Sequence, residues 1–212
     1  FVADAAHELR SPLATLRTRL ELGARQAPRL ATEALTDVER IQRLAADLLL
    51  LARLDAGEPP GCDEVDLGQV ATEEALRRID ARVPIRLEVA SDVLVRGSRT
   101  HLARMIGNLL DNAVRHAESA VTVRVAPPAR VEVIDDGPGI PPEHRESVFD
   151  RFTRLDEARA RDAGGSGLGL AIARDIARTH GGTLVVTGDR GSCLRADLRP
   201  YREEEPEPRA GR

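Results

Sequence analysis

The sequence contains no lysine and no tryptophan, and among its 212 residues it has one tyrosine, three phenylalanines and two cysteines. Lysine binds phosphate in the P-loop and in the eukaryotic protein-kinase site, so its absence excludes both sites. Aromatic residues make up 2% of the chain, and 31 basic residues stand against 35 acidic ones. There is no basic stripe and no base-stacking platform, so we expect no nucleic-acid partner.

Long apolar runs and paired cysteines are also missing. Cys62 and Cys193 show neither CxxC nor Cys/His spacing, which excludes a transition-metal site around them and fits a reducing cytoplasm. The sequence contains no signal peptide and no apolar run long enough to span a bilayer, and it opens on Phe1 within an amphipathic pattern. We therefore expect an excised fragment, with any membrane span in segments outside it.

The first part of the chain has the apolar spacing of a helical hairpin. Apolar residues recur at steps of four and three from Val2 to Leu20 and again from Ala34 to Ala52, with a break at 23–28. The second apolar face is wider than one helix can cover, so two hairpins should pair as a dimeric four-helix bundle. We assign residues 1–56 to this α-helical hairpin and predict a homodimer.

A second domain follows a linker at 57–64, which combines Gly, Pro and charge. Residues 65–200 predict an α/β domain with helices on one face of a sheet. The Glu- and Pro-rich tail 201–212 is expected to be disordered. The expected elements of the domain are helices 67–80, 98–117 and 167–180, strands near 84–90, 92–96, 120–126, 130–135, 183–187 and 193–198, and an irregular stretch at 136–165.

His7 is a candidate nucleophile in the first helix. It follows the seam residue Ala6, so its ring should flank the bundle; a neutral imidazole offers a lone pair, and Glu8 can hold its tautomer or accept its proton. Ser11 lies one turn further on the same face. Alternatively, Ser11 caps a helix that begins at Pro12 and His7 lies in a frayed end. The apolar spacing continues across Pro12, which favours a proline inside the helix at a cost of ~3 kcal/mol.

Helix 98–117 presents a polar wall. Asn108, Asn112, Arg115 and His116 stand at i, i+4, i+7 and i+8 and therefore share one face. Amide oxygens are ligands suited to Mg²⁺, which also bridges to nucleotide phosphates. The alternative is an ordinary solvated helix face.

Two glycine-rich segments add to this wall. The strand 131–134 ends in Asp135-Asp136-Gly137-Pro138-Gly139, where an aspartate can accept a hydrogen bond from an adenine amino group and glycines let backbone approach a base. The run 164–170 enters a helix, whose amides and dipole would bind phosphate. Its spacing fits neither a dinucleotide fingerprint nor a P-loop. Common turn punctuation and a flexible glycine loop are the alternative interpretations.

These segments together resemble the sensor histidine kinases of two-component systems. Residues 1–13 are similar to the H-box of the HisKA class, in which the histidine receives phosphate from ATP. In order, 108–116, 135–140, 148–154 and 165–170 resemble the N, G1, F and G2 boxes of the GHKL (Bergerat) ATP-binding fold, and 141–166 resembles its mobile lid. The resemblance covers Phe1 to about Pro200.

The resemblance implies a role for each matched residue. His7 would be the phosphoacceptor, with Glu8 and Ser11 beside it; Ser11 departs from the usual threonine or asparagine, which puts phosphatase activity in doubt. The implied nucleotide residues are Asn112 at Mg²⁺ with Asn108 as neighbour, Arg115 and Arg151 toward phosphates, Asp135 at the adenine, His116 in place of a stacking aromatic, and Gly137, Gly139, Gly165, Gly167, Leu168 and Gly169 in the G boxes.

The implied function is ATP-dependent autophosphorylation of a histidine, followed by phosphotransfer to an aspartate of a response-regulator receiver domain. The chain would be the cytoplasmic part of a bacterial inner-membrane sensor. Two alternatives stay open from the sequence: a GHKL-type ATP hydrolase acting as a conformational clamp, and a non-catalytic dimerisation adaptor. Such hydrolases carry glutamate where this chain has Asn108, and intact boxes weigh against the adaptor.

Overall fold

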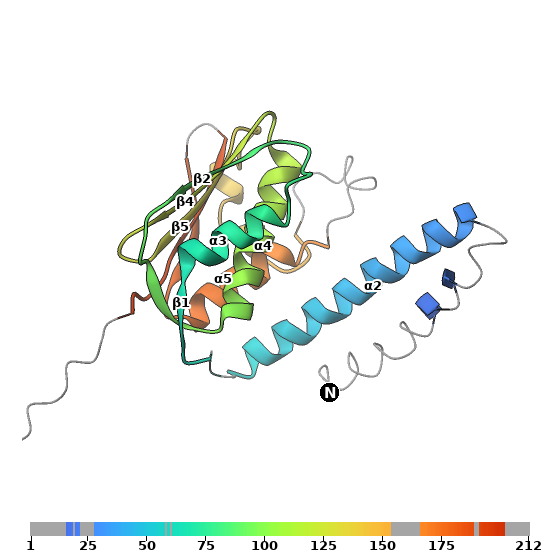
Figure 1. Cartoon of the computed structure of the whole chain (residues 1–212), viewed down its shortest axis with the longest axis horizontal. Helices are drawn as coiled ribbons and strands as arrows, with labels where there is room; N and C mark the ends of the chain where they lie inside the picture. The colour runs from blue at the N-terminus through green and yellow to red at the C-terminus, as the bar shows by residue number, and fades with distance from the viewer. Residues whose placement is uncertain are drawn as a thin grey trace, which may run out of the picture.

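The structure is a computed structural model that describes residues 16–18, 20–21, 28–57, 59, 61–153, 166–188 and 191–201. Helix α2 (Pro28–Asp55) projects from an α/β body (Figure 1). The body contains strands β1 (Asp63–Asp66), β2 (Ile85–Val89), β3 (Leu94–Gly97), β4 (Val121–Ala126), β5 (Arg130–Asp135), β6 (Thr183–Thr187) and β7 (Ser192–Asp197), helices α3 (Leu67–Leu76), α4 (Arg99–His116) and α5 (Gly169–Thr179), and the short 3₁₀ turns η1 (Pro142–His144) and η2 (Ser147–Phe149).

A five-stranded mixed sheet forms the body in the order β2-β4-β5-β7-β6, and β1 pairs with β3 beside it. Strand β2 runs parallel to β4, while the other pairs are antiparallel. Burial alternates along β4, β5 and β7, so only one face of the sheet is fully covered. Helices α3, α4 and α5 lie against that face (Figure 1), which confirms the predicted packing.

The helices of the body begin where polar side chains satisfy their first amides. The Asp66 carboxylate accepts from the amides of Gly68 and Gln69 at 2.7 and 3.2 Å, and Ser98 Oγ accepts from the His101 amide at 3.3 Å. At the other end of α4, the Arg82 guanidinium donates to the last carbonyl oxygens. Its positive charge stabilises this terminus, because the C-terminal end of the helix dipole is negative. The polar wall of α4 is therefore fixed at both ends.

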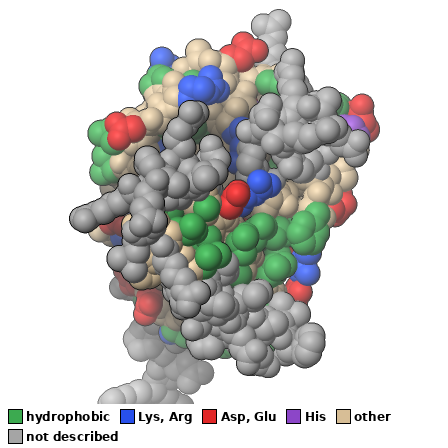
Figure 2. All heavy atoms as spheres, turned by 90° about the vertical axis from the view of Figure 1, so that its right-hand side faces the viewer, with side chains coloured by type: hydrophobic (Ala, Val, Ile, Leu, Met, Phe, Trp, Pro, Cys, Tyr) green, Lys and Arg blue, Asp and Glu red, His purple; other side chains and the backbone are tan. Residues whose placement is uncertain are grey.

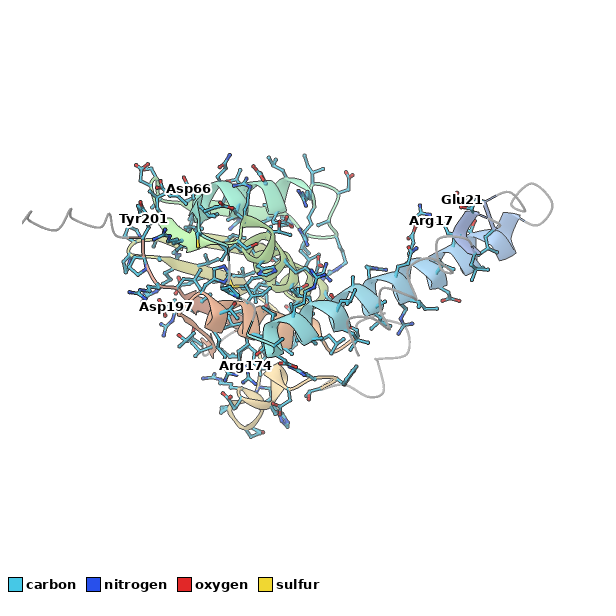
Figure 3. The ribbon with its side chains drawn as sticks, turned by 90° about the horizontal axis from the view of Figure 1, so that it is seen from below. Arg17, Glu21, Asp66, Arg174, Asp197 and Tyr201 are labelled. Carbon is cyan, nitrogen blue, oxygen red and sulfur yellow. The ribbon has the colours of Figure 1, made fainter. Side chains whose placement is uncertain are left out.

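Helix α2 belongs to both parts of the molecule. In its first half, Glu39 lies 3.9 Å from Arg17 of the preceding helical segment, so the two segments lie side by side as the hairpin prediction requires (Figure 3). At its end, Leu51 and Leu54 are buried in the core of the α/β body. Within the described residues, no helix combines the length and apolarity needed to cross a membrane.

Three local features differ from the sequence-based expectation. Strand β1 begins at Asp63, inside the expected linker, because it pairs with the distant strand β3. Helix α3 ends at Leu76 rather than near residue 80; Ile79 beyond it is exposed and has no apolar surface to join. The Tyr201 amide donates to the Leu94 carbonyl at 2.9 Å, so the chain stays attached one residue into the expected tail.

Candidate functional site

A buried carboxylate lies at the end of strand β5. Asp135 is 3% exposed, and its Oδ1 accepts a hydrogen bond from the Gly137 amide at 3.0 Å. Its Oδ2 is buried without a well-formed hydrogen bond from any residue that the structure describes. Burial raises the pKa of Asp135, and Gly137, His116 and Ser192 oppose that rise in part. A buried oxygen of this kind is a ready acceptor for a ligand amino group.

Glycines hold the turn after Asp135 against neighbouring backbone. A Cβ on Gly137 would lie 2.2 Å from the His116 carbonyl oxygen, and one on Gly139, whose φ is +76°, would lie 2.6 Å from the Gly191 carbonyl oxygen. The sequence suggested that these glycines approach a base, whereas the close contacts in the structure are with α4 and with the turn before β7. Their effect is to fix Asp135 beside the end of α4.

The neighbouring Asp136 has a structural role. Its exposed carboxylate accepts hydrogen bonds from the Ser119 hydroxyl and from the amides of Glu118, Ser119 and Ala120. These bonds, that of the Ser119 hydroxyl above all, hold the pKa of Asp136 well below its usual range. Asp136 therefore ties the loop after α4 to the end of β5, and only Asp135 faces inward.

The polar residues of helix α4 face the end of strand β5 and the start of helix α5, which we call the nucleotide edge. The opposite face of the helix is fully buried through Leu102, Met105, Leu109 and Ala113, so the helix cannot rotate. Asn108 and Asn112 are half-buried, whereas Arg115 and His116 in the last turn are exposed.

Asn108 joins α4 to the start of helix α5. Its Nδ2 donates to the Gly169 carbonyl oxygen at 3.0 Å. Because the amide nitrogen is committed to that bond, its oxygen Oδ1 is fixed near Gly169. The N-box and G2-box residues predicted to share a site are therefore side by side.

Among the residues that the structure describes, no side chain caps the first amides of helix α5. Gly167, with φ +71°, turns the chain into the helix, and Leu168 anchors that turn in the core. The Phe152 amide donates to the Gly167 carbonyl at 2.9 Å. Uncapped amides at a helix N-terminus favour an anion. Gly165, also predicted here, lies outside the described residues.

The Arg151 guanidinium is held by carboxylates of α2 and α5. Its two terminal nitrogens donate to the two carboxylate oxygens of Asp55 at 3.0 and 2.6 Å, and it also lies 3.4 Å from Asp175. The hydrogen bond with Arg151 lowers the pKa of Asp55. The predicted contact of Arg151 with phosphate stays a prediction.

Sequence reasoning missed the residues that support the site from α5. Arg174 lies 2.6 Å from Glu146 and stacks over Phe149, with its guanidinium carbon 5.1 Å from the ring centre (Figure 3). It thereby holds η2, the segment that leads to Arg151, against α5. Alternating charge on a helix was the only signal in the sequence, and such charges usually face solvent.

The predicted phosphoacceptor group His7, Glu8 and Ser11 lies outside the described residues. Among the residues that are described, no three His, Cys, Asp or Glu side chains gather as a metal site. A divalent cation at this edge would therefore rely on the amide oxygens of Asn112 and Asn108 and on ligand phosphates, which suits Mg²⁺.

Two family models match the chain. Residues 1–57 match the His Kinase A (phospho-acceptor) domain, and residues 97–202 match the Histidine kinase-, DNA gyrase B-, and HSP90-like ATPase domain. The first model contains the predicted phosphoacceptor, and the second contains the whole polar edge described above.

Curated relatives and solved structures are consistent with both matches. The probable sensor histidine kinase TcrY of Mycobacterium tuberculosis is 41% identical over 208 residues, covering 90% of this chain and 43% of TcrY. The signal transduction histidine-protein kinase/phosphatase MprB of Mycolicibacterium paratuberculosis is 39% identical, covering 88% of this chain and 39% of MprB. The chain thus spans less than half of either relative. The crystal structure of full-length ShkA in complex with AMPPNP is 25% identical and matches 95% of this chain and 46% of ShkA, with a TM-score of 0.77.

Proposed function

The chain belongs to the sensor histidine kinases of two-component systems, and we propose that it transfers the γ-phosphoryl group of ATP to His7 and then to an aspartate of a response-regulator receiver domain. The observation that supports this most strongly is the burial of the Asp135 carboxylate. Within the described residues, the buried oxygen Oδ2 of Asp135 has no well-formed hydrogen bond, and at a strand end beside a polar helix it suits the amino group of adenine.

In this proposal, different residues of the site bind different parts of the nucleotide. Adenine lies at Asp135, with His116 beside the base and Gly137 and Gly139 fixing the turn. The phosphates lie at the start of α5, where Gly167 and Gly169 present backbone amides and Leu168, whose amide donates to Ser166 Oγ, fixes the turn. Asn112 binds Mg²⁺ with Asn108 next to it, and Arg115 faces the phosphates. Bound Mg²⁺ would neutralise part of the phosphate charge.

Phosphoryl transfer needs a nucleophile that the α/β body does not supply. A nitrogen of neutral His7 attacks the γ-phosphorus, the bond from that phosphorus to the bridging oxygen breaks, and ADP leaves. Glu8 takes the imidazole proton. The phosphoryl group then passes from the His7 nitrogen to an aspartate oxygen of the receiver domain. Ser11 keeps a hydroxyl four residues after His7 but departs from the usual threonine or asparagine, so the proposal is confined to the kinase and transfer steps.

The hairpin offers a surface for a second copy of the chain. On α2, Ile41 and Leu48 are 45% and 39% exposed, and Figure 2 shows hydrophobic side chains gathered on the side of the molecule toward which α2 extends. A pair of hairpins would cover such a face as a four-helix bundle. Residues 1–56 thus form the dimerising unit, 57–64 the hinge and 65–200 the catalytic unit, acting in the cytoplasm where ATP is available.

The proposal is tested by incubating the chain with γ-labelled ATP and Mg²⁺, beside His7→Gln and Asn112→Ala variants, and treating the product with acid or alkali. The expected result is label that is lost in acid, kept in alkali and absent from both variants. A folded wild type that binds ATP and releases phosphate without becoming labelled would refute phosphoryl transfer and support a hydrolase.

A further inference from the structure

The last residue of α2 is held by a cation from the α/β body. Asp55 and Arg151 form a two-pronged ion pair at 3.0 and 2.6 Å, although 96 positions separate them in sequence. An acidic residue at a helix C-terminus meets the negative end of the helix dipole and is disfavoured there. Arg151 offsets that cost, and Asp175 on α5, 3.4 Å from the same guanidinium, holds it from the other side.

The contact lies within a wider docking surface. Next to Asp55, Leu51 and Leu54 are buried in the core of the body. One further turn back, the Asp47 carboxylate, itself buried, accepts a hydrogen bond from Arg104 on α4. Two ion pairs and two leucines therefore fix the last three turns of α2 against α4 and α5, immediately before the expected hinge at 57–64.

Arg151 directly precedes a residue that contacts the turn before helix α5. The next residue, Phe152, donates its amide to Gly167, and a Cβ on Gly167 would lie 2.8 Å from the Phe152 backbone. Phe152 itself has a φ of +66°, so the chain turns sharply between the guanidinium and the glycine segment. The backbone next to Arg151 therefore lies against the turn that leads into α5.

We propose that Asp55 and the phosphates of bound ATP compete for Arg151, so that docking of the α2 end and nucleotide binding oppose each other. The inference rests on the proposed function, which puts the phosphates at the start of α5. ATP offers several negative charges where Asp55 offers one, and Asp175 lies on the same element as the phosphate site. Nucleotide therefore draws Arg151 away from α2 and loosens the end of that helix, while Leu51 and Leu54 keep the preceding turn on the body.

Competition makes the coupling reciprocal. If nucleotide weakens the Asp55–Arg151 pair, then loss of Asp55 strengthens nucleotide binding by the same factor. Asp55 is 53% exposed at its side chain, and ion pairs of this kind are worth about 0.2–1 kcal/mol. The expected effect is therefore a gain in affinity of up to about fivefold.

The test is a titration of the whole chain with a fluorescent ATP analogue and Mg²⁺, comparing wild type, Asp55→Asn, Arg151→Gln and the double variant. Asp55→Asn removes only a charge at an exposed site, so the chain folds. Asp37→Asn is the matched control, because Asp37 lies exposed on the same helix, away from the body. We expect tighter binding in Asp55→Asn, none of that gain in Asp37→Asn, and weaker binding in Arg151→Gln.

The double variant identifies the cause. In the Arg151→Gln background, Asp55→Asn should change the affinity no further. An unchanged or lower affinity in Asp55→Asn, or a gain that persists without Arg151, would overturn the competition while leaving ATP binding in place. A wild type that does not bind the analogue would overturn both the competition and the proposed function.

A second readout reports docking directly. Amide hydrogen exchange at residues 51–55 should speed up when the analogue is added to wild type, and should already be fast in Asp55→Asn. Exchange at 51–55 that slows or stays constant on nucleotide binding would contradict release of the α2 end.

Discussion

Replacing Arg78 by alanine should strongly destabilise the α/β body. Arg78 connects α3 with α4: it donates to Glu74 Oε2 at 2.9 Å, to Asp111 Oδ1 at 2.7 Å and to the Gly107 carbonyl at 3.0 Å. The Glu74 side chain is 7% exposed, so its charge depends on these contacts. Without Arg78, that buried carboxylate keeps only the exposed Arg77 as partner.

The expected loss follows from that burial. Removing one partner of a buried ion pair costs about 3–5 kcal/mol, and because Arg78 retains 19% exposure we expect about 3 kcal/mol. For a chain of this size, that loss lowers the midpoint of thermal unfolding by about 6–12 °C. Arg77→Ala is the matched control: Arg77 lies 3.2 Å from the same Glu74 but is 71% exposed, so its loss should cost about 0.2–1 kcal/mol.

The assay is urea unfolding followed by far-ultraviolet circular dichroism, since the chain has no tryptophan to report by fluorescence. Replacing Glu74 and Arg78 together by methionine should recover much of the stability, because the buried charge then leaves with its partner. If Arg78→Ala and Arg77→Ala cost the same, the reasoning from burial is refuted.

Three other changes test separate parts of the account. Burial lowers the pKa of His180 below 6.5 in the folded chain. As the pH falls, the imidazole is therefore protonated in the unfolded chain at a higher pH than in the folded chain. The contribution of His180 to the free energy of unfolding should be complete above about pH 6.5 and decline below it. Urea midpoints from about pH 8 to about pH 5, compared with His180→Gln, measure this, and a difference independent of pH would contradict it. Asp135→Asn replaces the acceptor oxygen by an amide, so it should weaken the binding of adenine nucleotide by about tenfold or more and leave the binding of guanine nucleotide unchanged. Calorimetric titration measures both affinities. Equal binding of adenine nucleotide by wild type and variant would show that Asp135 does not contact the base. Replacing Ile172 of α5, whose side chain is fully buried, by alanine should cost about 2–5 kcal/mol, and a loss under about 1 kcal/mol in the same urea assay would show that the core collapses around the cavity.

Elements with a strong local pattern could be predicted from the sequence. Helix α4 differs from its prediction by one residue at each end, because its buried and polar faces alternate with a clear helical period and Ser98 marks its start. Strand β5 matches its prediction because alternating buried valines precede an Asp-Gly turn. Strand β1 was missed because Val65 is its one buried residue, and its partner β3 is distant in sequence.

The nucleotide edge was predicted as a set of motifs, and the structure brings together those of them that it describes. Asn108 and Gly169 are hydrogen-bonded, and Asp135 lies beside His116. The position of Arg151 could not be predicted in the same way. A long arginine side chain can reach carboxylates on several elements, and only the docking of α2 determines that Asp55 is one of them.

The most direct test of the central claim is to locate the phosphate. After incubation of the whole chain with Mg²⁺ and ATP, peptide mapping by mass spectrometry under alkaline conditions should find a phosphoryl group on the imidazole of His7 and on no other side chain. A phosphate found elsewhere, or ATP consumed by a chain that stays unmodified, would contradict the assignment of His7 as the phosphoacceptor.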